Sequence, residues 1–393
     1  MKIKHAAIIL IIVLCSFFDI NAQQKAVTIV PVADLVGQSI GKEKYSKIAL
    51  FTHPVQFCPR MHQLLYNEVV TIVEEKGEEV CILLDSVFYE VAGNPNPQNT
   101  YWTLKKNIVP LETIKKSGIP LAAIPNPIDF NNCKSLYDQS VVSLALPFHD
   151  STTNRTYSAG TRFVKAPSQS SKDKISVFAL DHTSTKSLVI NLPRSLCIVT
   201  DRNKTEKERK AAFLRLVTTW AHQLNGFIPY VWGGCSFTAL AHGNHFASNQ
   251  IGQTHFYQPS VSLKHPYTGL DCAGLITRAA QLCGIPYFYK NTATLTNHLK
   301  EITYIRDVQD GDLIWFPGHV MIISSCKPAK IIEARAYGQG YGKIHELPLQ
   351  NVFKGIDSLE KLFTHLIEKK SLFRLASDGS IAHSVTKFKI VRF

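Results

Sequence analysis

The stretch Tyr267-Thr-Gly-Leu-Asp-Cys-Ala-Gly-Leu-Ile276 places a cysteine at the beginning of a helical pattern of apolar residues. The pattern continues to Leu282 and meets a helix stop signal at Gly284 and Pro286. Cys272 therefore belongs to the first turn of a helix, where unpaired backbone N–H groups and the helix dipole favour a thiolate over a thiol. The same N–H groups can stabilise an oxyanion. These features are typical of the nucleophile in a thiol hydrolase.

A histidine that can act as the base for Cys272 stands 47 residues further on. His319 opens the apolar run Val-Met-Ile-Ile, which predicts a position at the start of a strand. Unrelated thiol proteases pair a cysteine on a helix end with such a histidine, and a third group fixes the tautomer of the imidazole. Glu333 follows 14 residues later on the next predicted strand and is the first candidate for that third group. His345 is a weaker candidate.

The N-terminal segment has the pattern of a cleaved signal peptide. It begins Met-Lys-Ile-Lys-His and continues with an apolar run, Ala6–Phe18, which is too short to span a membrane. We expect cleavage after Ala22, which removes residues 1–22 as the signal peptide. A lipoprotein anchor at Cys15 is the less favoured alternative, because Leu14 is bulky where such sites use a small residue. The protein is therefore expected to be secreted or periplasmic, without stable membrane insertion.

The charge and the cysteine pattern exclude several classes of function. Removal of residues 1–22 lowers the net charge from +13 to +12, which suits an anionic environment such as a cell wall or lipid headgroups and equally serves solubility. No nucleic-acid-binding motif is present, and export argues against that partner. The eight cysteines after Cys15 include no Cys-x-x-Cys pair, so neither a structural zinc site nor a dithiol redox motif is indicated.

Secondary-structure patterns divide the mature chain into three predicted domains. Residues 23–130 and 131–203 contain short, closely spaced strands, which favour small β-barrels. A capping-box pattern at Thr205-Glu-Lys-Glu208 then opens a helix, and helices and strands follow as an α+β domain over residues 204–393. The predicted strands include Lys47–Phe51, Val69–Val73, Val80–Leu84, Val141–Leu146, Ile175–Leu180, Asp312–Phe316 and Lys330–Ala334, and the other predicted helices are Thr294–Ile302 and Ser358–Lys369.

Five ordered motifs between residues 206 and 349 together resemble the NlpC/P60 peptidases. They are Pro229-Tyr-Val-Trp-Gly-Gly234, Leu270-Asp-Cys-Ala-Gly-Leu275, Asp310-Gly-Asp-Leu-Ile-Trp-Phe316, Gly318-His-Val320 and Ile332-Glu-Ala334. The resemblance implies a papain-like fold and cleavage of peptidoglycan stem peptides, with Cys272 as nucleophile, His319 as base and Glu333 in the third position. We expect no cofactor and no metal.

Two stretches of the N-terminal half, Gln63–Val70 and Tyr157–Phe163, resemble bacterial SH3 domains. Such domains precede the catalytic domain in γ-D-glutamyl-L-diamino acid endopeptidases, which prefer stem peptides or muropeptides with a free L-alanine amine. The resemblance places Asp271, Glu68 and Tyr101 around that amine, since carboxylates and a hydroxyl accept charge-assisted hydrogen bonds.

The sequence departs from the family pattern in three ways. Glu333 stands where histidine is common, and Ala273 replaces the usual serine after the nucleophile. An insertion of 36 residues separates Gly234 from Asp271, with histidines whose spacing matches no standard metal site: His242, His245, His255 and His265. Tyr230, in the first motif, lines the cleft in this interpretation.

Two other functions stay open. One is a non-catalytic wall-binding protein with a degenerate peptidase domain, against which the retained cysteine and histidine argue. The other is a papain-like amidase or acyltransferase that acts on lipid or protein, which the departures at Ala273, Glu333 and the insertion permit.

Overall fold

The structure is a computed structural model that describes residues 24–48, 58–91, 94–167, 171–181, 183–222, 226–240, 246–248, 255–257, 268–336 and 341–393. The predicted signal peptide, Cys15, and most of the insertion with His242, His245 and His265 lie outside these residues. No helix in the described ranges is long and apolar enough to cross a membrane.

The first section of the chain is built on an antiparallel sheet of seven strands in the order β3-β2-β8-β5-β4-β1-β9. The strands are β1 (Lys25–Thr28), β2 (Val32–Val36), β3 (Arg60–Leu65), β4 (Val69–Lys76), β5 (Glu79–Leu83), β8 (Thr100–Leu104) and β9 (Ile108–Pro110). The hairpin β6 (Tyr89–Val91) and β7 (Asn94–Gln98) and the helix α3 (Leu111–Lys116) accompany this sheet.

The strand predicted at Lys47–Phe51 is wrong where the structure describes it. Residues 47 and 48 end the helix α2 (Lys42–Ile48). Tyr45 and Ile48 are three residues apart, which puts both on one helix face, and they pack there with Val36 and Leu104. A short apolar run does not by itself distinguish a strand from the buried face of a helix.

The second section shares a hydrophobic core with the first. It contains the sheet β13-β10-β16 and two hairpins. Tyr66 packs its ring 4.9 Å from that of Tyr157, and its hydroxyl accepts a hydrogen bond of 2.6 Å from the Leu180 backbone. The elements are β10 (Val141–Leu144), β11 (Phe148–Asp150), β12 (Arg155–Tyr157), β13 (Arg162–Val164), β14 (Lys174–Leu180), β15 (Ser187–Pro193) and β16 (Cys197–Ile198). The first two sections therefore fold against each other.

The third section is a six-stranded sheet with helices on both faces. Its order is β21-β28-β22-β23-β24-β25. Val320, Ile322 and Ile332 pack on one face of the sheet with α4 (Glu206–Ala221) and α5 (Cys272–Leu282). Met321 and Ile331 pack on the other face, in a separate hydrophobic core with α7 (Leu359–Ile367). The strands are β21 (Lys300–Glu301), β22 (Leu313–Phe316), β23 (His319–Cys326), β24 (Ala329–Arg335), β25 (Lys343–Pro348) and β28 (Lys389–Arg392), and a hairpin of β26 (Leu372–Leu375) and β27 (Ile381–Val385) follows α7.

The helices of this section follow the sequence signals. The capping box at Thr205 and Glu208 opens α4 (Glu206–Ala221) as predicted. Helix α5 covers Cys272–Leu282 and α7 covers Leu359–Ile367. The helix predicted at Thr294–Ile302 is much shorter, because α6 (Thr292–Leu295) passes into a single 3-10 turn and then into β21.

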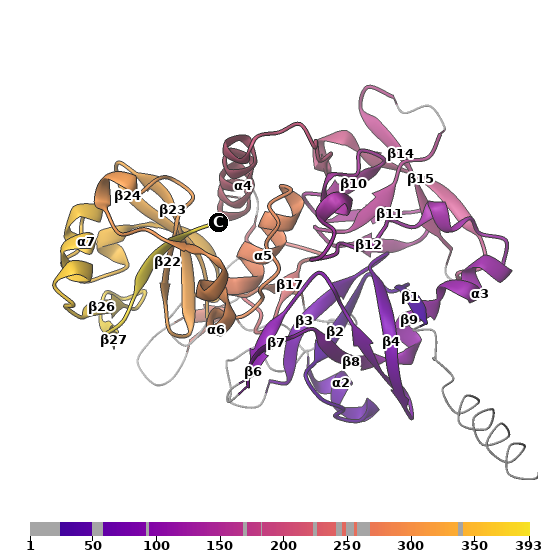
Figure 1. Ribbon diagram of the computed structural model, residues 1–393, viewed down its shortest axis with the longest axis horizontal. Helices are drawn as coiled ribbons and strands as arrows, with labels where there is room; N and C mark the ends of the chain where they lie inside the picture. Colours follow the sequence, from indigo (N-terminus) through magenta and orange to yellow (C-terminus); the bar gives the residue numbers. More distant parts are fainter. Residues whose placement is uncertain are drawn as a thin grey trace, which may run out of the picture.

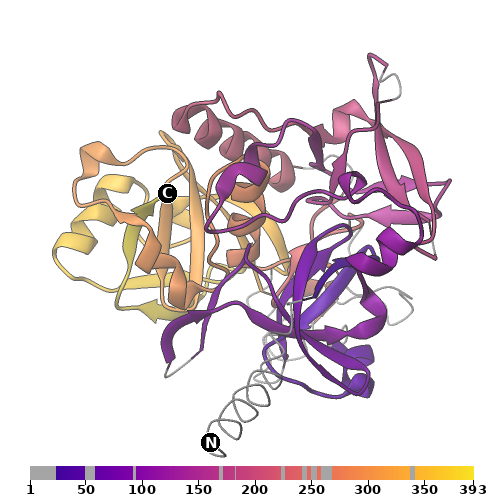
Figure 2. The same cartoon turned by 45° about the vertical axis from the view of Figure 1, so that its right-hand side comes forward.

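Helix α5 lies in the middle of the molecule, between the third-section sheet and the first-section strands (Figure 1). The hairpin β14–β15 and the helix α7 lie at opposite ends in both views (Figure 2). All residues of α5 are buried. Every section of the chain therefore contributes to the surroundings of this one helix.

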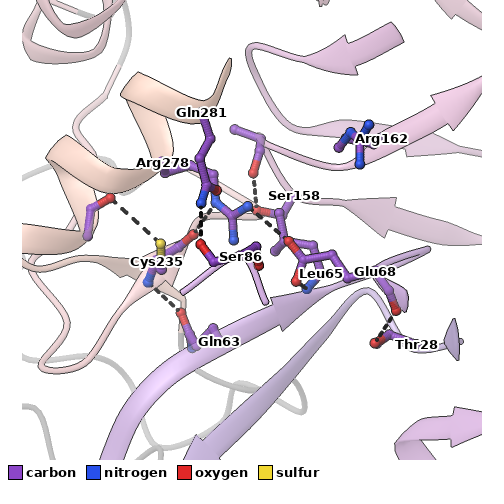
Figure 3. A network of polar contacts seen from close by, with 12 residues as sticks. Thr28, Gln63, Leu65, Glu68, Ser86, Ser158, Arg162, Cys235, Arg278 and Gln281 are labelled. Atoms are coloured by element: carbon purple, nitrogen blue, oxygen red, sulfur yellow. Dashed lines mark hydrogen bonds and ion pairs between the residues drawn. The ribbon is translucent and has the colours of Figure 1, made fainter. Parts of the chain in front are cut away.

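A buried arginine of α5 joins the helix to the other sections (Figure 3). The Arg278 side chain donates from Nε to the Cys235 carbonyl at 3.0 Å and from a terminal nitrogen to Glu68 at 3.0 Å. A Cβ at Gly160, where φ is +92°, would lie 2.6 Å from the Arg278 Cδ, so only glycine fits there. On the same helix, Gln281 donates to the Ser86 carbonyl at 2.9 Å.

We predict that Arg278→Met lowers the free energy of unfolding by about 3–5 kcal/mol, because it leaves the part-buried Glu68 carboxylate without its cation. Urea denaturation followed by fluorescence measures the change. Lys361→Met is the control, because Lys361 belongs to an exposed ion pair with Asp357 and its loss should leave the midpoint in place. Equal midpoints for Arg278→Met and wild type would contradict the prediction.

Candidate active site

Cys272 is the first residue of α5, and Asp271 is the N-cap of that helix. The Asp271 carboxylate accepts a hydrogen bond of 2.5 Å from the Gly274 backbone N–H. A Cβ at Gly274 would lie 2.0 Å from the Gly234 carbonyl oxygen, so the helix start and the Pro229–Gly234 motif meet backbone to backbone. The two glycines thus fix the cysteine at the junction of two motifs that lie 36 residues apart in sequence.

The Cys272 thiol is buried and protonated at neutral pH. The residue is 8 % exposed, and burial followed by the Asp271 charge raises the pKa of the thiol to about 12. Lys290 and the backbone N–H groups of Val320 and Ala273 act in the opposite direction without overcoming burial. The resting form is therefore the thiol and not the thiolate that the helix end favours in the sequence, because burial has the largest effect on its pKa.

The hairpin of β23 and β24 brings His319 and Glu333 together. His319 Nε2 lies 2.6 Å from a Glu333 carboxylate oxygen. Burial lowers the pKa of His319 below its usual value even though the hydrogen bond to Glu333 raises it, so the imidazole is neutral at neutral pH. With Nε2 bound to the carboxylate, Nδ1 is the ring nitrogen left for a proton transfer.

The structure brings Cys272 to the start of β23 without a hydrogen bond to His319 among the described residues. The backbone N–H of Val320, the residue after His319, lies against the sulfur. Catalytic hydrogen bonds are often long in substrate-free enzymes and tighten when substrate binds. Cys272 is therefore a neighbour of the start of β23, where His319 lies.

Glu333 is fully buried and is held by side chains from three strands. It accepts hydrogen bonds from His345 Nε2 on β25 at 3.0 Å and from Arg374 on β26. Burial alone would raise the pKa of the carboxyl, but Arg374, followed by His319 and His345, holds it well below its usual range. Glu333 is therefore a permanent anion, suited to orienting the His319 imidazole.

Arg374 has no counterpart among the residues predicted from the sequence. It stands 41 residues after Glu333, is 1 % exposed, and lies over the Phe353 ring at 5.2 Å. The five motifs end before residue 349, so the resemblance contains no signal for it. The glutamate in an apolar strand is the signal that could have indicated Arg374, because a buried carboxylate requires a cation elsewhere in the chain.

Asp271 and Glu68, the predicted ligands of a substrate amine, each already contact a cation. Lys290 Nζ donates to both carboxylate oxygens of Asp271, at 2.8 and 2.6 Å. Glu68 accepts from Arg278 at 3.0 Å and from the Leu65 backbone N–H at 2.9 Å. Neither Lys290 nor Arg278 was singled out in the sequence.

The two predicted tyrosines are both buried. Tyr101 is 0 % exposed, donates its hydroxyl to the Val87 carbonyl at 3.1 Å and packs against Tyr89 in the first-section core. Tyr230 belongs to the core around α5, and its backbone N–H donates to the Gly342 carbonyl at 2.8 Å. Contact of either side chain with a substrate stays a prediction.

A metal site requires a cluster of ligand side chains, and a disulfide requires a pair of bonded cysteines. The described part of the chain contains no group of three or more His, Cys, Asp or Glu side chains that could hold a metal ion. Of the four histidines of the insertion, only the backbone of His255 is described, in β19 (His255–Tyr257), which pairs with β18 (Phe246–Ser248). All eight described cysteines are free thiols.

The fold is shared with an NlpC/P60 family protein from Bacillus cereus. Its crystal structure has a TM-score of 0.52 at 15% identity, covering 83% of this chain and 94% of that chain. NlpC2 and NlpC1 from Trichomonas vaginalis are each 11% identical over 83% of this chain and 93% and 88% of their own, with TM-scores of 0.31 and 0.29. No protein-family model matches the chain, and no curated protein does.

The chain therefore has an NlpC/P60-like fold, which confirms the resemblance that the five motifs predicted. The fold combines sheets and helices, as expected for the α+β class. The SH3 identity of the first two sections and the boundaries of the three predicted domains stay predictions.

We predict that Arg374→Met moves the pH dependence of Cys272 alkylation to higher pH. In the wild type the rate should fall below pH 6.5, as neutral His319, with its lowered pKa, becomes protonated. Arg374 contributes to that lowering, so its removal raises the pKa of His319. The acidic limb of the profile, the pH range in which the rate falls, then moves to higher pH. Iodoacetamide labelling followed by peptide mapping measures the profile.

Arg374→Lys is the matched variant for this experiment, because it keeps the positive charge beside Glu333 and should keep the acidic limb in place. An acidic limb that is unchanged or moves to lower pH in Arg374→Met, with labelling intact, would contradict the electrostatic role of Arg374.

Proposed function

We propose that this protein is a thiol hydrolase that cleaves an amide bond of peptidoglycan stem peptides, with Cys272 as nucleophile, His319 as base and Glu333 as the group that orients the base. The contact between His319 Nε2 and Glu333, at 2.6 Å on the hairpin whose start lies against the Cys272 thiol, carries the proposal. A buried, neutral imidazole fixed by a permanent carboxylate is suited to accept a proton from a thiol.

The protonation states define the first chemical step. Because thiol and imidazole are both neutral at rest, His319 Nδ1 takes the proton from Sγ as the sulfur attacks the carbonyl carbon. The backbone N–H groups at the sulfur stabilise the negative charge of the tetrahedral intermediate. The imidazolium then protonates the leaving amine, a thioester forms, and water deprotonated by His319 hydrolyses it.

The proposed class of substrate is supported by the similarity of the fold to a known family and by the charge and the N-terminal segment of the chain. The fold is that of an NlpC/P60 family protein, and the chain carries a predicted signal peptide and a surplus of positive charge that suits a cell wall. We extend the proposal to the γ-D-glutamyl–diamino acid bond, with the first two sections as SH3-like wall-binding domains and an exported, secreted or periplasmic location.

A non-catalytic wall-binding protein is the second candidate. It is favoured by the deep burial and the high pKa of the Cys272 thiol. In the described part of the chain this thiol also has no hydrogen bond to His319. Equal binding to peptidoglycan by wild type and Cys272→Ala, with no product from either, would support this alternative. Turnover of a lipid or protein amide instead would support an amidase or acyltransferase.

We expect protein lacking residues 1–22 to release L-Ala-γ-D-Glu from a stem tripeptide that contains diaminopimelate, as detected by mass spectrometry. Cys272→Ala should abolish release, and Glu333→Gln should lower kcat by about 10²–10⁴-fold because the imidazole loses its orienting anion. Cys283→Ala, at the other end of α5, is the matched control and should keep its activity. Intact free stem peptides and intact sacculi after incubation with wild type would refute the proposal.

A further inference from the structure

The two carboxylates that the sequence predicts as amine ligands, Asp271 and Glu68, have no charge left for a substrate cation. Asp271 directly precedes the nucleophile and is 9 % exposed. Its Oδ1 accepts from the Gly274 backbone N–H and from Lys290, and its Oδ2 accepts from Lys290 at 2.6 Å. Glu68, the other predicted amine ligand, is neutralised by Arg278. Both carboxylates are therefore compensated from within the chain.

Lys290 is a fixed part of the fold. Its side chain is 3 % exposed, and its backbone N–H donates to the Phe88 carbonyl of the first section at 2.8 Å. The preceding residue, Tyr289, accepts a hydrogen bond of 3.0 Å from the Thr277 hydroxyl of α5. A long, flexible side chain that is anchored on both sides and desolvated does not leave its partner at little cost.

The field of these cations extends into the first section. His62 on β3 is 1 % exposed, and its Nδ1 has no hydrogen-bond partner among the residues that the structure describes. Burial, followed by the charges of Arg278 and Lys290, lowers the pKa of His62 well below its usual value. His62 is therefore neutral and adds no anion that could receive a substrate ammonium.

We propose that Lys290 takes the place of a substrate ammonium next to Cys272, so that the protein accepts stem peptides whose N-terminal amine is acylated and uncharged. Stem peptides that are still attached to glycan through an amide have this chemistry, whereas free peptides end in an ammonium. The inference rests on the proposed stem-peptide hydrolysis and names its substrate class. Lys290 is thereby the residue that determines specificity at the N-terminal side of the substrate.

The experiment compares L-Ala-γ-D-Glu-diaminopimelate with its N-acetylated form. Wild type should cleave the acetylated peptide at least as well as the free one, by kcat/KM. Lys290→Met exposes the Asp271 carboxylate and should shift the ratio about tenfold or more toward the free amine, through a charge-assisted hydrogen bond. Asp271→Asn/Lys290→Met removes that anion and should lose the gain. Lys361→Met, an exposed lysine on α7, should leave the ratio unchanged.

A binding measurement separates this inference from the proposed function. The dipeptide L-Ala-D-Glu, with a free or an N-acetylated amine, is tested for protection of Cys272 against iodoacetamide, which needs no turnover. The acetylated compound should protect wild type at least as well as the free one, and Lys290→Met should reverse the order. The inference is overturned if wild type cleaves the free peptide at least tenfold better than the acetylated one. It is equally overturned if the free compound protects Cys272 at least tenfold better than the acetylated one. Cleavage of the free peptide would still uphold the proposed function. If neither peptide is cleaved, the proposed function fails and the protection order decides the inference.

Discussion

The buried guanidinium of Arg278 is the constraint on which the arrangement of the molecule depends. A charge at 2 % exposure is tolerated only with partners, and those partners come from different sections: Glu68 after β3, and the Cys235 carbonyl next to the glycine motif. Gly160 of the second section lies against the same side chain. Because Arg278 is on α5, the assembly of these sections also fixes the helix whose first residue is Cys272.

The same physical rule, that a buried charge needs a partner, repeats at the candidate site. Asp271 has Lys290, and Glu333 has Arg374. The consequences differ. The first pair leaves the Asp271 carboxylate beside Cys272 without net charge, whereas Glu333 also keeps a hydrogen bond to His319. Paired charges of this kind attract a free ion weakly, because the field of each charge is largely cancelled by its partner.

The sequence predicted the parts of the site that depend on local patterns. A helix start at Cys272 and a hairpin that joins His319 to Glu333 follow from periodicity over about ten residues. The partners of the charges could not be predicted in this way. Lys290 lies 19 residues from Asp271, Arg374 lies 41 from Glu333, and Arg278 lies 210 from Glu68. Such pairs form only in the tertiary structure, and no rule of sequence spacing predicts them. The protonated thiol was missed for the same reason, because burial depth is a property of the whole fold.

The buried glutamate at position 333 takes its counter-charge from a segment beyond the motifs. A neutral histidine there could orient the base without a counter-charge, but a carboxylate at 0 % exposure requires a cation to remain ionised. Arg374 supplies it from β26, and the core that surrounds α7 keeps that strand in place. The segment after residue 349 is thus electrostatically part of the site. The buried Glu333 carboxylate and the C-terminal segment that supplies its cation therefore depend on each other.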